Sequence, residues 1–167
     1  MTHGPRYRVK PRRHRQCRTD YRRRYHLLKS RKTRIVVRKT IKQVIVQFIE
    51  YQPTGDIVVA SAVSSELKEF TWDHSLSSTP AAYLTGLLAG KRASAKGITH
   101  GILDIGRGVP SKGSKVFAAL KGVVDAGIQC PCDESRMPSE ERLQGAHLKG
   151  SVADDVKRVK KTITEVK

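Results

Sequence analysis

The sequence predicts an α/β protein in which a mixed sheet, crossover helices and an extended basic N-terminal arm share one chain of 167 residues. Residues 34–62 hold three β-rich runs separated by turn signals, which predicts an N-terminal antiparallel meander. A capped apolar helix and a short apolar strand follow, which predicts a crossover unit. Residues 1–42 carry seventeen Lys and Arg and one acid, which is a net charge of +16 out of the formal +18 of the chain. A segment with this charge is predicted to become ordered only when it binds a polyanion.

Residues 1–42 suit nucleic acid better than other polyanions, because twelve of their seventeen basic residues are Arg. Guanidinium binds phosphate bidentately and stacks on bases. The interleaved rings are Tyr7, His14, Tyr21, Tyr25 and His26. This mixture favours folded or single-stranded RNA over a solubilising tail or a membrane-surface patch, since residues 3–26 lack the apolar face of an interfacial helix. Charge alone does not separate DNA from RNA.

The arm, residues 3–18, is expected to be extended because Pro5 and Pro11 disfavour helix. A helix should begin near Thr19, capped by Thr19 or Asp20. Arginines should occupy its outer face, and a thin apolar stripe should anchor it to the domain. That stripe comprises Tyr21, Tyr25 and Leu28.

Three strands are expected at 34–38, 43–51 and 57–62, because these runs are rich in β-branched and aromatic residues. The turns between them fall at 38–42, which is basic, and at 52–56, where Pro and Gly favour a reversal. Consecutive strands joined this way should pair antiparallel, and the basic turn should project from one end of the sheet.

Residues 64–78 read as irregular, and a helix should then run from a Ser78 or Thr79 cap to Gly97. The spacing of Gly86 and Gly90 predicts close backbone packing on the sheet. The apolar face of this helix comprises Tyr83, Leu84, Leu87 and Leu88.

The second half of the chain predicts a strand at 102–105, buried on both faces, and a helix at 115–126. A short strand at 128–130 and a short helix opening at Pro138 should follow. An amphipathic helix should begin at Ser151. Its apolar stripe comprises Val152, Val156, Val159, Ile163 and Val166.

The expected organisation is a basic RNA-binding arm and helix (1–33), an α/β domain (34–135) and C-terminal helices (136–167). No apolar run approaches the ~20 residues of a membrane span, and no signal peptide is recognisable, so a cytosolic or nuclear protein is expected. Three cysteines do not form a disulfide framework. Cys130 and Cys132 lack paired partners for a zinc site, so no metal and no cofactor are expected.

Two segments could carry chemistry. Residues 108–115 have the spacing of a P-loop but end in Gly-Ser-Lys, which misplaces the lysine and the hydroxyl, although the loop could still hold an RNA phosphate. The carboxylates of Asp56, Asp104 and Asp125 could bind magnesium in a nuclease. The favoured alternative is an ion pair of Asp104 with the neighbouring basic loop, at Arg107 or Lys112.

Several runs carry a family resemblance in their order and spacing. They are G-P-R-Y at 4–7, R-T-D-Y at 18–21, L-L-K-S at 27–30, R-I-V-V-R-K-T at 34–40, A-Y-L-T-G-L-L-A-G at 82–90, L-D-I-G at 103–106, G-S-K-V-F-A at 113–118 and G-A-H at 145–147. Nearly the whole chain resembles the archaeal–eukaryotic branch of the universal large-subunit ribosomal protein family that binds 5S rRNA, the eighteenth in bacterial naming. The short C-terminal region is similar to archaeal members.

The resemblance implies an α/β fold related to the small-subunit protein eleven family, no catalysis, and a place in the cytoplasmic ribosome. It implies contact with 5S rRNA, large-subunit rRNA, a neighbouring 5S-binding ribosomal protein and other large-subunit proteins in the central protuberance, with no membrane. The residues expected to face RNA are Arg6, Tyr7, Arg8, Lys10, Arg12, Arg13, Arg15, Arg18, Arg22, Arg23, Arg24, Arg31, Lys32, Arg34, Arg38, Lys39, Thr40, Lys42, Lys112, Ser114 and Lys115.

Two alternative functions remain at this point. A magnesium-dependent nuclease on a similar mixed sheet would lose activity on Asp104→Asn with the fold intact. A DNA-compacting protein would use the basic segment but would leave the nearly neutral residues 43–167 unexplained.

Overall fold

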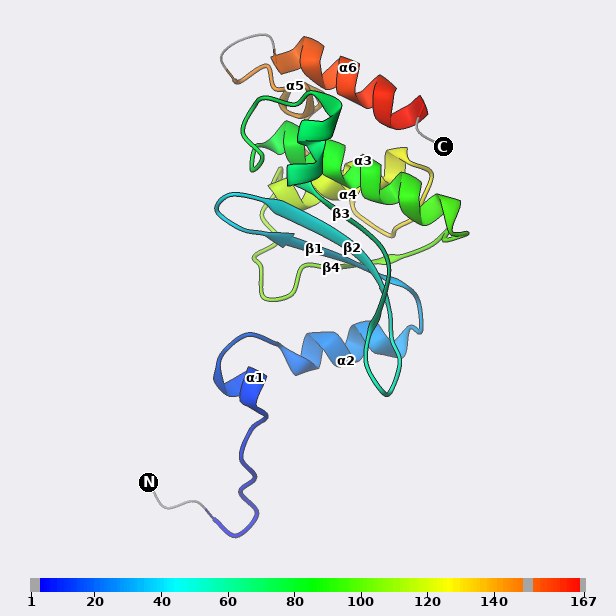
Figure 1. Cartoon of the computed structure of the whole chain (residues 1–167). Coiled ribbons are helices and arrows are strands. Elements are labelled where there is room, and N and C mark those ends of the chain that lie inside the picture. The colour runs from blue at the N-terminus through cyan, green and yellow to red at the C-terminus, as the bar shows by residue number, and fades with distance from the viewer. Residues whose placement is uncertain (1–3, 149–151, 166–167) are drawn as a thin grey trace.

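Four strands form one mixed sheet in the order β3-β2-β1-β4. β1 (Arg34–Lys39) pairs antiparallel with β2 (Val44–Glu50), and β2 pairs antiparallel with β3 (Ile57–Val63). β4 (Ile102–Asp104) lies at the opposite edge from β3 and runs parallel to β1. The computed structural model describes residues 4–148 and 152–165 (Figure 1). The three strands expected between residues 34 and 62 are confirmed.

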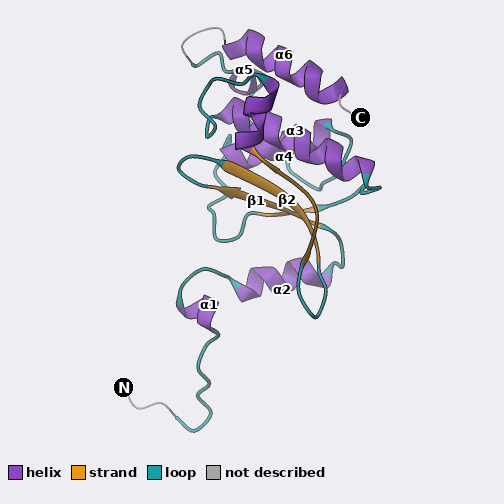
Figure 2. Ribbon diagram, viewed as in Figure 1, coloured by secondary structure: helices purple, strands orange, loops and turns teal. Residues whose placement is uncertain are grey.

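The two faces of the sheet follow from the alternation of side chains along each strand. Ile35 and Val37 of β1, with Val46 and Phe48 of β2, are buried on the face that the long helices cover. The other face, on the side of α2 in Figure 2, carries Arg34, Val36 and Arg38, because these residues alternate with Ile35 and Val37 along β1. β1 therefore places two arginines and one valine on the face of the sheet that lies away from the helical layer.

α3 (Thr79–Ala95) is the central helix of the covered face. Ser78 caps it by accepting a hydrogen bond from the N–H of Ala81, and Pro80 lies in its first turn, as expected. It packs on β2 and β3, on α4 (Lys115–Asp125) and on α6 (Val152–Glu165). Every residue from Thr79 to Gly90 is buried, so the prediction of a single apolar face was wrong.

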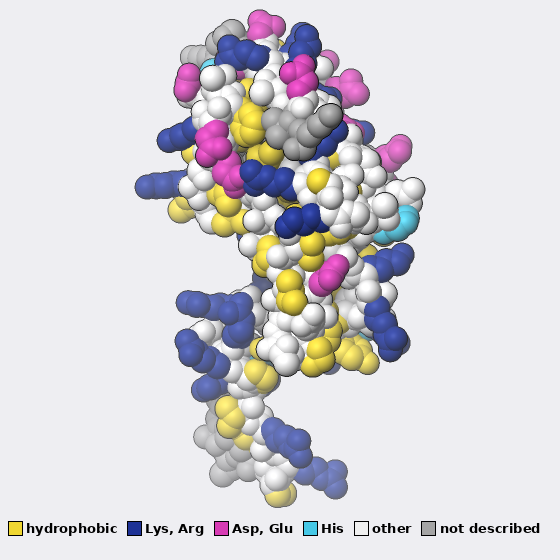
Figure 3. All heavy atoms as spheres, turned by 45° about the vertical axis from the view of Figure 1, so that its right-hand side comes forward, with side chains coloured by type: hydrophobic (Ala, Val, Ile, Leu, Met, Phe, Trp, Pro, Cys, Tyr) yellow, Lys and Arg dark blue, Asp and Glu magenta, His cyan; other side chains and the backbone are white. Residues whose placement is uncertain are grey.

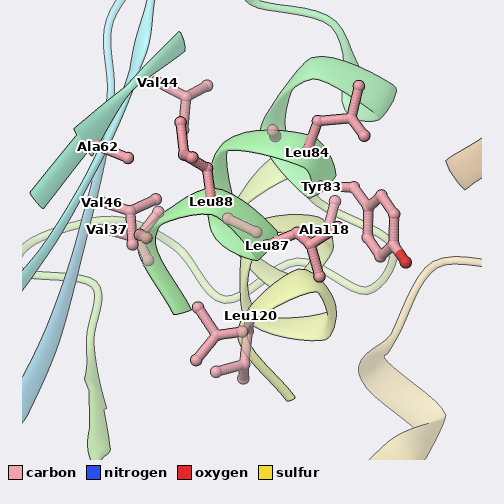
Figure 4. Packing of buried hydrophobic residues seen from close by; sticks show 14 of the residues in the cluster. Val37, Val44, Val46, Ala62, Tyr83, Leu84, Leu87, Leu88, Ala118 and Leu120 are labelled. Carbon is pink, nitrogen blue, oxygen red and sulfur yellow. The ribbon is translucent and has the colours of Figure 1, made fainter. Parts of the chain in front are cut away.

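Apolar residues of α3 and α4 pack together in the core (Figure 4), and glycines of α3 allow the close approach of α4. A Cβ at Gly86 would fall onto the carbonyl of Ala119, and one at Gly90 would meet Ala126. Gly122 of α4 fits in the same way against the carbonyl of Tyr83. The prediction that these glycines pack on the sheet was therefore wrong, because the close contact is between two helices.

An outer layer covers α3. η1 (Ser64–Phe70), a 3₁₀ helix, occupies the first part of the segment 64–78 that was expected to be irregular, and residues 71–78 contain no helix or strand, as expected. η2 (Glu134–Arg136) and α5 (Glu140–Gln144) precede α6. The amphipathic C-terminal helix is confirmed, because α6 buries an apolar stripe against α3, η1 and α5. The buried stripe comprises Val152, Val156, Val159 and Ile163. Ser151 and Val166 lie outside the described residues.

Two predictions about short strands need correction. β4 is an edge strand whose Ile102 and Leu103 are only half-buried, because its outer side carries no full neighbouring strand. Residues 128–130 form no strand, and Gln129 makes an isolated parallel bridge with His100 instead. Within the described residues, none of the helices combines the length and apolar character needed to cross a membrane.

Candidate nucleic-acid interface

α1 (Arg12–Arg15) and α2 (Tyr21–Lys29) lie on the side of the sheet opposite α3 (Figure 1). α1 corrects the expectation of a fully extended arm. It begins directly after Pro11, whose missing N–H and fixed φ are compatible with the start of a helix. The side chain of Arg13 donates to Thr19 Oγ1 at 2.9 Å, which ties α1 to the segment before α2.

Asp20 caps α2, as predicted, by accepting hydrogen bonds from the N–H groups of Arg22 (3.0 Å) and Arg23 (3.2 Å). The bond from Arg23 is the main cause that lowers the pKa of Asp20 below its usual 3.8, so the cap is ionised near neutral pH. The predicted anchoring stripe was wrong, because Tyr21 is 39% exposed and Tyr25 is 64% exposed. α2 contains no buried residue.

Arginines attach α2 to the domain instead. Arg24 Nη2 donates to both carboxylate oxygens of Asp56, at 3.0 and 2.8 Å, across the open face of the sheet. Arg23 Nη1 donates to the carbonyl of Gly106, at 3.3 Å, in the loop after β4. The position of α2 therefore depends on polar contacts with two separate loops.

An alternating chain of ion pairs continues from Asp56 into the sheet. Arg34 donates to Asp56 at 2.7 Å and to Asp104 at 3.1 Å, and Arg38 donates to Asp104 at 3.1 Å. Burial alone would raise the pKa of Asp56, but hydrogen bonds from Arg24 and Arg34 outweigh it and lower the pKa. The order Arg24–Asp56–Arg34–Asp104–Arg38 links α2, the β2–β3 turn, β1 and β4.

This chain corrects two predictions. Arg34 is only 3% exposed, with both ends of its guanidinium bonded to carboxylates, so it does not face a polyanion as expected. An ion pair of Asp104 was the favoured interpretation and is confirmed, but its partners are Arg34 and Arg38 rather than Arg107 or Lys112. A buried charge is retained only when it is paired in this manner.

A groove of about 900 Å³ runs between α2, the open face of the sheet and the loop after β4. Leu27, Val36 and Ile49 contribute apolar surface to it, and the ion-pair chain lies along it. Its cationic lining, apart from Arg34, comprises Arg13, Arg18, Arg23, Arg24, Arg38, Lys39 and Arg107. Cations from four separate segments thus converge on one concave surface.

The β1–β2 turn is rigid and basic. Thr40 N–H donates to the carbonyl of Gln43 at 2.8 Å, and Gln43 N–H donates to Thr40 Oγ1 at 2.9 Å. Lys39 and Lys42 are exposed on either side of Ile41, which is 95% exposed. The Thr40 side chain therefore closes the turn that presents the lysines.

The loop before α4 places its three predicted residues differently. Lys112 is exposed, and Lys115 is half-buried as the first residue of α4. Ser114 is the N-cap residue, yet its buried Oγ has no hydrogen-bond partner among the described residues. Arg107, which we had not predicted as an RNA contact, is exposed and lines the groove, and its position directly after Gly106 in a basic loop was the available signal.

The remaining predicted residues are mostly at the surface. Arg24 and Arg38 are half-buried by their ion pairs. Figure 3 shows Lys and Arg side chains over the arm and the basic segment, whereas over the helical layer Asp and Glu are mixed with Lys and Arg. The exposed ones are Arg6, Tyr7, Arg8, Lys10, Arg12, Arg13, Arg15, Arg18, Arg22, Arg23, Arg31, Lys32, Lys39, Thr40 and Lys42.

The carboxylates of the nuclease alternative are engaged elsewhere. Asp56 and Asp104 are held by arginines, and Asp125 accepts the hydroxyl of Tyr83 at 2.7 Å. Across residues 4–148 and 152–165, no group of three His, Cys, Asp or Glu side chains could hold a metal ion. Burial raises the pKa of Cys130 to about 11, so it is a neutral thiol at neutral pH.

Comparisons with known proteins identify the family of the chain. The family model described as "Ribosomal large subunit proteins 60S L5, and 50S L18" matches residues 5–101, which include α1, α2 and the first three strands. The large ribosomal subunit protein uL18 of Korarchaeum cryptofilum is 51% identical over 148 residues, covering 89% of this chain and 76% of that protein.

Two further archaeal proteins of the same name are similar. The one from Staphylothermus marinus is 48% identical, over 89% of this chain and 74% of its own length. The one from Methanococcoides burtonii is 47% identical, over 89% of this chain and 86% of its own length. Identity at this level over most of both sequences leaves one conclusion: the chain belongs to the family of ribosomal large-subunit proteins 60S L5 and 50S L18.

Proposed function

We propose that this chain binds 5S rRNA as a structural constituent of the large ribosomal subunit and helps to anchor it in the central protuberance. Its relatives are ribosomal proteins rather than enzymes, and the family places it in the large subunit of the cytoplasmic ribosome. The proposed partners are 5S rRNA, large-subunit rRNA, a neighbouring 5S-binding ribosomal protein and other large-subunit proteins. The proposed fold relationship is to the small-subunit protein eleven family.

The convergence of cations on the groove beside α2 carries this proposal. Phosphate oxygens are the acceptors that a row of guanidinium groups binds best, bidentately and through charge-assisted hydrogen bonds. The arginines at the groove come from α1, α2, β1 and the loop after β4, so a folded RNA would contact several elements at once. Phosphate contacts would supply most of the affinity and RNA shape most of the specificity.

Binding of the full chain to 5S rRNA and to duplex DNA of equal length, measured across a salt series, tests the proposal. With about 8–12 phosphates neutralised, affinity for both nucleic acids should fall steeply as salt rises. The preference for 5S rRNA should survive at high salt, because shape-specific contacts are screened less than phosphate contacts. A variant that lacks residues 1–18 retains α2 and all four strands and should lose most of that preference.

Equal affinity for the two nucleic acids at every salt concentration would overturn 5S rRNA recognition and leave a non-specific polycation. If the truncated variant still preferred 5S rRNA to duplex DNA, the residues that recognise 5S rRNA would lie in the domain and not in the arm. Circular dichroism of the truncated variant is the necessary control, since it should retain the helices and sheet of the domain.

A further inference from the structure

Two rings of the basic segment lie nearly parallel beside the groove. The centroids of the His14 and Tyr21 rings are 6.4 Å apart, and their planes differ by 21°. Successive bases in a nucleic-acid stack are about 3.4 Å apart, so one base between two rings needs about 6.8 Å. The centroid distance is the upper limit of the gap between the two ring planes, so the rings must move apart by at least about 0.4 Å to hold a single base between them.

Local contacts hold the two rings in place. His14 belongs to α1, and the chain turns back after it at Cys17, which has a left-handed φ of 53°. The side chain of Arg13 bonds to Thr19 Oγ1, and the N–H of Thr19 donates to the carbonyl of Arg13. Tyr21 is the first residue of α2, whose cap is Asp20. The spacing is therefore set by hydrogen bonds that close around it.

A second cavity, of about 550 Å³, touches both rings. A volume of this size can admit one nucleotide. Besides His14, Asp20 and Tyr21, its lining is cationic and comprises Lys10, Arg22, Arg23 and Arg107. The site therefore combines two stacking surfaces for a base with cations for the adjoining phosphates, which is the combination that proteins use for unpaired nucleotides.

Asp20 provides, at the same cavity, a hydrogen-bond acceptor that distinguishes one base from another, which we call the reading group. Its Oδ1 accepts the two N–H groups of α2, whereas its Oδ2 is 3.7 Å from Arg23 Nε, too far for a hydrogen bond. A carboxylate only accepts hydrogen bonds. Guanine is the base whose Watson–Crick edge offers two adjacent donors, N1–H and the N2 amino group, so an ionised Asp20 favours guanine over adenine.

We propose that His14, Tyr21 and Asp20 form a clamp for one unpaired guanine nucleotide. The proposal rests on the proposed RNA-binding function and deepens it, because it names a single-stranded element that this chain would hold. The rings stack on both faces of the base, Asp20 accepts from its edge, and Lys10 and Arg107 neutralise the flanking phosphates.

Single-stranded and duplex RNA probes separate the clamp from general phosphate binding. The full chain is titrated with a hexaribonucleotide of five adenines and one guanine and with a blunt RNA duplex. Tyr21→Ala should weaken binding of the single strand about tenfold, equivalent to ~1.4 kcal/mol, and leave duplex binding and the salt slope unchanged. Tyr21→Phe, which keeps the ring, should bind as the wild type does.

Tyr25→Ala is the matched control, because Tyr25 is an exposed tyrosine one turn further along α2 that does not line the cavity. It should bind both probes with wild-type affinity. Equal losses in Tyr21→Ala and Tyr25→Ala would overturn the clamp.

Asp20→Asn tests base selection without removing the cap, since Asn caps helices as well as Asp does. The wild type should prefer the guanine-containing hexamer to an all-adenine hexamer by about fivefold, through hydrogen bonds to a charged acceptor. The variant should lose that preference even though removing an acid strengthens binding to any polyanion. An undiminished preference in Asp20→Asn would exclude Asp20 as the reading group and overturn the guanine clamp.

The two proposals fail in different ways. If the wild-type chain does not prefer 5S rRNA to duplex DNA, the proposed function falls. If the wild-type chain does prefer 5S rRNA but Tyr21→Ala binds the single-stranded hexamer with wild-type affinity, only the clamp is refuted.

Discussion

Arg34 demonstrates at the scale of one residue how position decides the role of a charge. It lies in a segment whose other cations are mostly exposed, yet it is 3% exposed and bonds to Asp56 and Asp104. Its place on β1 brings it next to β4, where the register sets Val36 opposite Asp104. A guanidinium there satisfies two carboxylates that would otherwise face an apolar sheet edge. Its contribution is therefore structural.

Replacing Asp104 should reveal this role. Asp104→Ala leaves Arg34 and Arg38 without one of their partners in a buried setting, and breaking such a pair costs about 3 kcal/mol of unfolding free energy. Urea denaturation followed by circular dichroism measures the loss. Asp73→Ala, at an exposed aspartate, is the control and should change stability by less than about 0.5 kcal/mol. A stable Asp104→Ala variant would mean that Asp56 alone suffices to hold Arg34.

At the scale of the element, the position of α2 depends on polar contacts with the domain and not on burial of an apolar face. It contains no buried residue, and its bonds to the domain run through Arg24 to Asp56 and through Arg23 to Gly106. A helix attached in this way keeps its other two cations, Arg22 and Lys29, exposed and available. The domain orients α2 while most of its cationic surface stays open for a polyanion.

Asp56→Asn should loosen α2 with little effect on the rest of the fold. The pKa of Asp56 is lowered in the folded state, so its contribution is complete above the ordinary value of 3.8 and is lost as the pH falls through the folded pKa. Hydrogen exchange should show α2 amides opening roughly fivefold more readily in the variant at pH 7, equivalent to about 1 kcal/mol.

Acid should remove the difference between the two proteins. The pKa of Asp56 in the folded protein lies below 3.8, so the stabilising contribution of the carboxylate should begin to decline below pH 3.8 and be lost as the pH falls through the lowered pKa. The α2 protection of Asp56→Asn and wild type should therefore converge progressively below pH 3.8. Amides of α3, which is buried on the side of the sheet opposite α2, serve as the internal control and should be unaffected. A difference that does not shrink at all as the pH is lowered below 3.8 would mean that the carboxylate charge does not hold α2.

Elements whose signals are local could be predicted from the sequence, and contacts between distant elements could not. The Ser78 cap and Pro80 determine where α3 begins, and Asp20 does the same for α2, so both helices were predicted. The Tyr21 and Tyr25 stripe failed because helical periodicity identifies a face without showing whether the domain covers it. Burial of Arg34 depends on Asp56 and Asp104, 22 and 70 residues away, and no local pattern reports that pairing.

In the candidate interface, too, local features could be predicted from the sequence and contacts between distant segments could not. Charge density identified the arm, α2 and the basic turn at 38–42, since these are properties of composition. Arg107 was missed because only the parallel pairing of β4 with β1 brings its loop beside α2. The ring pair of His14 and Tyr21 likewise depends on the reversal at Cys17, which the arginine-rich sequence does not signal.

The whole molecule is polarised across the sheet. One side carries α1, α2 and the cationic groove, and the other carries the apolar core sealed by α6. His74 and Asp155, 2.8 Å apart, connect the segment after η1 to α6 on that sealed side. Residues 1–42 carry a net +16 of the formal +18, so most of the net positive charge lies on the side of α1 and α2. The protein should therefore approach a nucleic acid with this side first, and removing cations here should weaken binding more than removing cations from the helical side.

Matched neutralisation at the two ends tests this polarity. A variant with Arg8, Arg12 and Arg15 changed to Ala loses three exposed cations near α1, and one with Lys68, Lys157 and Lys161 changed to Ala loses three on η1 and α6. Both variants have the same net charge. The first should bind 5S rRNA more weakly at every salt concentration, and the slope of log affinity against log salt should fall by about 2 to 3 in magnitude.

The second variant should retain the wild-type slope, because its lysines lie on the sealed side. Fluorescence anisotropy between 50 and 300 mM salt, a range that spans roughly a twofold change in Debye length, resolves the two slopes. Equal losses in both variants would show that net charge alone drives binding and that the segregation across the sheet does not orient the protein. Unequal losses place the polyanion on the side of α2, where the groove and the ring pair are.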